Sequence, residues 1–184
     1  MWPLSSSVRL RMSTPSQVTT QATAAAYYLY GMEAGLCTIE DAKEWAFSVI
    51  ASLEDPPIHI IDVATSKTFE DAHSSLAAAA RDADVPLAGS RLLGTIRIAL
   101  MSGELTLRLA LRSAMQVARS TSMPRDVYYA FDGVEDALSL AENQTYGTVE
   151  QAYAYALEEF DRFSAYGEAQ SNCSLKRTNQ SLRD

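Results

Sequence analysis

The residues best suited to chemistry in this chain are two histidines, His59 and His73, and the carboxylates near them in sequence. Imidazole and carboxylate groups ligate metal ions, so Asp62, Glu70 and Asp71 could in principle join both histidines in one site. The histidines lie fourteen residues apart, however, and belong to no HExxH, HxH or EF-hand pattern. A metal-dependent enzyme is therefore the least favoured hypothesis for this chain, and we expect no cofactor and no metal.

Motifs for nucleophilic catalysis and for phosphate binding are also missing from the sequence. No GxSxG elbow occurs, and Cys37 has no histidine partner that the sequence makes obvious. The eight glycines are scattered singly, without GxxxxGK[ST] or GxGxxG. Cys37 and Cys173 form no CxxC pair, so we interpret both as reduced thiols in the cytoplasm, with Cys37 packed as a small hydrophobic residue. We predict that the protein is not an enzyme.

The chain is acidic, with 23 Asp and Glu against 15 Lys and Arg and a formal net charge of −8. Nucleic-acid binding depends on clustered Lys and Arg that displace counterions, so the expected partner is a basic protein and not nucleic acid. The charge is also segregated. Residues 14–84 hold eleven acids against three basic residues, residues 85–125 hold six arginines against Glu104, and residues 126–163 hold nine acids against Arg162.

This segregation has a simpler interpretation as well. Mild acidity keeps many proteins soluble, and the central arginines could lie on exposed helix faces or pair with acidic neighbours at about 1 kcal/mol or less each. Both interpretations place the acids on the surface. The two interpretations differ in whether a partner protein binds to that acidic surface.

The length of 184 residues suits one domain whose hydrophobic core needs no disulfide. No stretch approaches the roughly 20 apolar residues of a membrane-spanning helix, so we expect no membrane association. The helical domain should span residues 14–166. Residues 1–13 are predicted to be a disordered leader, with Met12 as an alternative start, and residues 167–184 a disordered tail rich in polar residues.

Capping residues and apolar spacing predict an all-α bundle of about six to eight helices, built from consecutive helical hairpins. Thr14 should cap a first helix that Gly35 ends, and Thr38 and Thr148 should cap two later ones. Residues 58–66 are ambiguous between a short helix and irregular structure, and the helix is favoured because an isolated strand would have no partner. The helix after Pro124 is expected to be interrupted at residues 132–133.

Two stretches, residues 35–66 and 127–152, resemble small helical bacterial proteins associated with the immunity partners of polymorphic toxins. The shared features are a Gly-Leu turn before a Trp-bearing helix, a Pro-Pro break, and a late Tyr-Gly turn that opens the last helix. The residues that match are Gly35, Leu36, Trp45, Pro56, Pro57, Tyr146 and Gly147. Phe47 stands where the resemblance would place an aspartate. These elements are caps and packing residues, so the resemblance concerns the fold more than the activity.

The leading hypothesis is a non-enzymatic, cytoplasmic immunity-type protein that neutralises a basic toxin or effector domain by occluding it. Tyrosine combines a large apolar face with a hydroxyl group, and acids attract a cationic partner. The predicted partner-binding residues are therefore Asp132, Glu135, Asp136, Glu142 and Tyr146. The alternative is a helical adaptor or self-associating scaffold that forms a homodimer through its alanine- and leucine-rich central helices.

Overall fold

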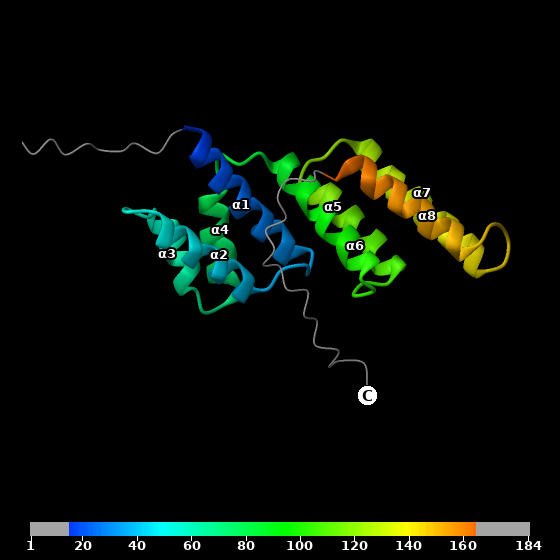
Figure 1. Cartoon of the computed structure of the whole chain (residues 1–184), viewed down its shortest axis with the longest axis horizontal. Helices are drawn as coiled ribbons and strands as arrows, with labels where there is room; N and C mark the ends of the chain where they lie inside the picture. The colour runs from blue at the N-terminus through cyan, green and yellow to red at the C-terminus, as the bar shows by residue number, and fades with distance from the viewer. Residues whose placement is uncertain (1–14, 165–184) are drawn as a thin grey trace, which may run out of the picture.

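The computed structural model describes residues 15–164, and within them the chain is entirely helical (Figure 1). This confirms the predicted all-α fold of consecutive helical hairpins. The predicted leader (1–13), the Thr14 cap and the predicted tail (167–184) lie outside the described residues. The eight helices are α1 (Pro15–Glu33), α2 (Ile39–Ser52), α3 (Ile58–Thr65), α4 (Phe69–Ala79), α5 (Val85–Met101), α6 (Leu107–Ser120), α7 (Arg125–Glu142) and α8 (Val149–Phe163).

Local capping chemistry fixes where several helices begin. The Thr38 hydroxyl accepts a hydrogen bond from the Asp41 amide, and the Asp41 carboxylate accepts one from the Thr38 amide at 2.7 Å. Thr148 and Gln151 form the same reciprocal capping box at the start of α8. Each box satisfies two amides that have no partner within the helix. Gly35 follows the end of α1 and has a φ of +66°, the left-handed conformation predicted for the residue that ends this helix.

Two predictions about helix continuity have different outcomes. Residues 58–65 form the short helix α3, which the sequence favoured over irregular structure. The predicted interruption at residues 132–133 is wrong, because α7 runs unbroken from Arg125 to Glu142. Gly133 faces solvent, and a glycine inside a helix costs only about 1 kcal/mol relative to alanine. Burial of Phe131 and Val134 on either side offsets that cost.

The last four helices form a four-helix bundle. Short turns at residues 102–106, 121–124 and 143–148 connect them, and α5 packs on α6, α6 on α7, α7 on α8, and α8 back on α5. Neighbours joined by such short turns run antiparallel. The turn between α7 and α8 lies at one end of the molecule, and α3 lies at the other end of its longest axis (Figure 1).

Helix α1 joins this bundle to the first part of the chain. It packs against α4 on one side and α5 on the other, while α2, α3 and α4 pack against one another in sequence. The Tyr27 and Thr95 hydroxyl groups, 2.8 Å apart, link α1 to α5. One continuous hydrophobic core runs through both parts, with Tyr28 stacked on Trp45 and Phe131 against Phe160. None of the described helices has the length and apolar character needed to cross a membrane.

Gly89 lets the bundle close at the start of α5. A Cβ atom at this position would lie 2.2 Å from the Thr121 Oγ1 atom and 3.0 Å from the Met123 sulfur. Any side chain on residue 89 would therefore push the end of α6 away from α5. Gly89 lies in α5 and Thr121 ends α6, so the contact joins residues that are distant along the chain.

Candidate protein-binding surface

The turn between α7 and α8 is the most exposed ordered segment of the described chain. Residues 142–150 are all exposed. The turn nevertheless has defined hydrogen bonds, since the Thr145 amide donates to the Leu140 carbonyl at 2.9 Å and Thr148 caps α8. Gln144 and Gly147 take positive φ angles of 54° and 74°. The turn therefore protrudes from the bundle with a defined backbone conformation.

Three tyrosines are exposed on this hairpin. Tyr146 in the turn is 78% exposed, Tyr129 on α7 is 62% exposed and Tyr155 on α8 is 53% exposed. Leu140 and Val149 add exposed apolar groups near the turn. Large tyrosine surfaces that end in a hydroxyl group are typical of protein interfaces.

The five predicted partner-binding residues fall into two groups. Asp136 and Tyr146 are exposed and Asp132 is half-buried, so all three can present their side chains at the surface. Glu135 and Glu142 instead both bind the Arg108 guanidinium, one on each of its terminal nitrogens. The Glu135 side chain is only 22% exposed. Its contact with Arg108 makes Glu135 a link between α6 and α7.

The hairpin keeps a negative surface after these pairs are counted. Asp161 pairs with Arg97 of α5 at 2.8 Å, and Glu159 lies 3.7 Å from Arg162. Four of the nine acids in residues 126–163 thus form ion pairs, with three arginines. The other five acids of residues 126–163 have no ion pair with any described residue, and they are Asp126, Asp132, Asp136, Glu150 and Glu158.

The Glu150 carboxyl group has a pKa below the ordinary glutamate value. It lies in the first turn of α8, and a hydrogen bond from the backbone and one from the Thr148 side chain hold its pKa below the ordinary glutamate value. Both hydrogen bonds favour the charged carboxylate, as does the positive end of the helix dipole. Glu150 therefore keeps its negative charge to a lower pH than an ordinary glutamate does.

The histidines and their neighbouring acids do not assemble into one site. The His73 Nε2 atom lies 2.8 Å from the Glu33 Oε1 atom, and its ring stacks on Phe69. Glu70 precedes His73 by one helical turn, but residues 15–164 contain no group of three His, Cys, Asp or Glu side chains placed to hold a metal ion.

Asp62 and Asp71 both line a surface hollow of about 430 Å³. Neither His59 nor His73 lines it. The remaining lining residues are Thr65, Ser66, Lys67, Ser74 and Ser75. Cys37 is buried with its sulfur close to Gly31, as predicted for a packed thiol, and Cys173 lies outside the described residues.

Sequence reasoning missed the contact between Arg108 and the two glutamates. Glu135 and Glu142 are seven residues apart, a spacing that places them on one face of α7, and this was the available signal. The register between α6 and α7 decides which arginine meets them, and that register is a tertiary property.

No protein family model matches the chain, and searches of curated proteins and of solved structures find no match either. The resemblance to immunity partners therefore stays a prediction.

Proposed function

We propose that this chain is a non-enzymatic, cytoplasmic binding protein of the immunity type, which neutralises a basic toxin or effector domain by occluding it. The observation that supports the proposal is the hairpin of α7 and α8, which carries exposed tyrosines and acids that have no ion pair with a described residue. Occlusion requires complementary surface and no bond-making step. The resemblance described for residues 35–66 and 127–152 points in the same direction.

The unpaired acids would act mainly on the rate of association. Asp136 and Glu150 lie on the hairpin without ion pairs in the described chain, so their field extends into solvent. Such a field steers a cationic partner and raises its association rate more than its final affinity. High salt would weaken this steering, because the Debye length falls to about 3 Å at 1 M.

The tyrosines would supply most of the binding energy. Interface hot spots are enriched in Tyr, Trp and Arg, and exposed Tyr146 is the most prominent candidate on the hairpin. The turn that carries Tyr146 is held by its own hydrogen bonds, and α7 and α8 are packed in the bundle. A surface that is already ordered loses little conformational entropy when it binds.

The test is co-expression with the product of the neighbouring gene. Wild-type protein should co-purify with that product and restore growth that the product alone impairs. The double variant Tyr146→Ala/Asp136→Lys should lose both effects. Phe47→Ala is the matched control, because Phe47 is a comparably exposed aromatic residue on α2, outside the hairpin. Growth that is the same with and without the wild-type protein would contradict the proposal.

The scaffold alternative relied on the alanine- and leucine-rich central helices. Most of those side chains are buried within the protein's own core, among them Ala88, Leu92, Ala99, Leu111 and Ala114. Self-association through this region would have to use the exposed residues Ile98, Met101 and Leu109. A concentration-dependent dimer in light scattering that Ile98→Asp abolishes would favour the scaffold over the immunity proposal.

A further inference from the structure

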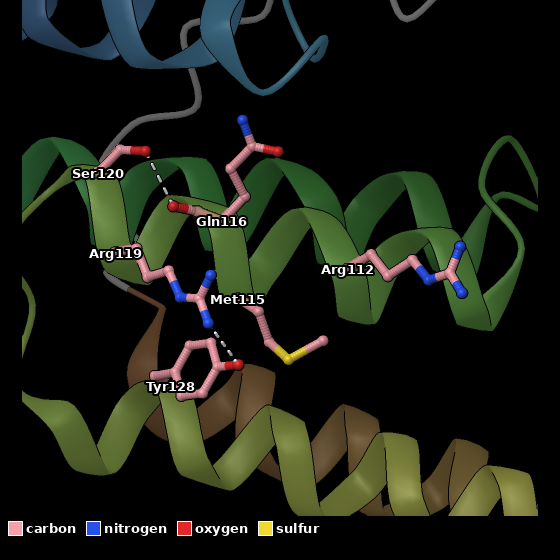
Figure 2. A pocket seen from close by; sticks show the side chains of 6 residues that line it. All are labelled: Arg112, Met115, Gln116, Arg119, Ser120 and Tyr128. Carbon is pink, nitrogen blue, oxygen red and sulfur yellow. Dashed lines mark hydrogen bonds between the residues drawn. The ribbon is translucent and has the colours of Figure 1, made fainter.

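A surface groove of about 360 Å³ lies beside α6 (Figure 2). Five of the six residues that line it come from α6, and the sixth, Tyr128, comes from α7. The lining contains two arginines and no acid. The full set is Arg112, Met115, Gln116, Arg119, Ser120 and Tyr128.

Arg119 is held in place at one end of the groove. Its guanidinium carbon lies 4.5 Å from the centre of the Tyr128 ring, and its Nη2 atom donates a hydrogen bond to the Tyr128 hydroxyl at 2.9 Å. The guanidinium group has five N–H donors, so most of them remain available after this bond. Tyr128 thus orients a cation that can still bind an oxyanion.

Arg112 is the second cation of the groove. It is exposed, and no hydrogen bond or ion pair joins it to another residue in 15–164. Glu135 on the neighbouring helix α7 is already bound to Arg108. Figure 2 shows the Arg112 side chain extending along α6, away from Arg119.

The remaining polar groups help to fix the shape of the groove. The Gln116 side-chain amide donates to the Glu33 carbonyl at the end of α1, 3.0 Å away, and the Ser120 hydroxyl donates to the Gln116 carbonyl. Both side chains point away from α7, whereas Met115 and Arg119 point toward it (Figure 2). Met115 lies between Arg112 and Arg119 along α6 and gives this part of the groove an apolar side chain.

We propose that this groove binds an acidic polypeptide segment carrying two carboxylates. Arg112 and Arg119 are seven residues apart on one helix, so their Cα atoms are separated by about 10.5 Å. In an extended chain, side chains on one face are about 6.6 Å apart when they are two residues apart in sequence, and about 13 Å apart when they are four residues apart. Arginine side chains reach both spacings, and guanidinium groups bind carboxylates with paired hydrogen bonds. The open groove favours a segment that lies along it, because compact small molecules are usually enclosed on most sides.

Fluorescence anisotropy of the full chain with a rhodamine-labelled peptide tests this site. The probe is Gly-Glu-Gly-Ser-Gly-Glu-Gly with blocked ends, and the comparison peptide has glutamine in place of both glutamates. The glutamate peptide should bind at low salt and the glutamine peptide should not. Arg112→Gln/Arg119→Gln should weaken binding at least tenfold, because both cations are lost.

Arg125→Gln is the matched control, because Arg125 is an exposed arginine that does not line the groove. It should bind the peptide like the wild type, and so should Tyr146→Ala, which separates this site from the proposed partner surface. Equal binding by the groove variant and the wild type would overturn the proposal. So would inorganic phosphate binding as tightly as the peptide, which would indicate a small-anion site instead. Circular dichroism of each variant verifies that the helices remain folded.

Discussion

Glu135 and Glu142, two turns apart on α7, bind the same guanidinium group, that of Arg108 on α6. This contact links α6 to α7 at the end of α7 that leads into the turn with Tyr146. It also divides the acids of the hairpin into those that hold the bundle together and those that face solvent.

Replacing Arg108 with alanine should destabilise the protein by about 1–2 kcal/mol. The guanidinium is 31% exposed and its partners 22% and 47%, so solvent screens each pair, but two charge-assisted hydrogen bonds are lost together. Urea unfolding at low and high salt measures the effect, which should shrink as salt increases. Arg112→Ala is the control, since Arg112 has no ion pair in the described chain. A similar loss of stability in both variants would contradict the assignment.

Gly89→Ala should destabilise the protein by about 1–3 kcal/mol. The new methyl group would lie within 2.2 Å of the Thr121 Oγ1 atom, so α5 and the end of α6 must separate. Thermal unfolding measures the change. The double variant Gly89→Ala/Thr121→Gly removes the obstructing side chain and should regain part of the lost stability. A Gly89→Ala protein as stable as the wild type would show that the two helices are not in close contact.

Gly133→Ala should have the opposite effect and stabilise the protein by about 0.5–1 kcal/mol. Gly133 lies inside the continuous helix α7, and apart from its chain neighbours and the adjoining helix backbone, no atom lies within 4 Å of the place where a Cβ would sit. Alanine then gains helix propensity without a clash. The same unfolding experiment checks the sign. Destabilisation would indicate that α7 is broken at this position after all.

The Glu150 carboxyl group should titrate below the ordinary glutamate value. Hydrogen bonds from the backbone and from Thr148 lower its pKa. Because the folded pKa is lower than the unfolded one, the stabilisation is present above the unfolded pKa and is lost as the pH falls through the folded pKa. Carbon-detected NMR titration of Glu150 gives the value directly. Thr148→Ala should raise this pKa, and an unchanged value would mean that the Thr148 hydroxyl does not contribute.

The sequence could predict those parts of the structure that depend on local chemistry. The Thr38 and Thr148 caps, the end of α1 at Gly35 and the helix of residues 58–65 all follow from side chains within a few positions of one another. The interruption at residues 132–133 was wrong for the complementary reason. That prediction rested on the local cost of Gly133 in a helix, whereas burial of the neighbouring core side chains keeps α7 continuous.

The candidate sites depend on contacts that the sequence cannot show by itself. Asp136 and Tyr146 are exposed as expected, but Glu135 is engaged with Arg108 because of how α6 and α7 align. The groove with Arg119 likewise exists only because Tyr128 of α7 lies beside it. Helical periodicity assigns residues to a face, whereas the partner of that face is set by the packing of the whole bundle.

Hydrogen–deuterium exchange of this protein, alone and with the product of the neighbouring gene, tests the central proposal most directly. Binding through the hairpin should slow exchange in the last turn of α7, in residues 143–148 and in the first turn of α8. The amides of α2 and α3, at the other end of the molecule, should exchange as before. Protection confined to α2 and α3, or no protection anywhere at saturating partner, would contradict the proposal.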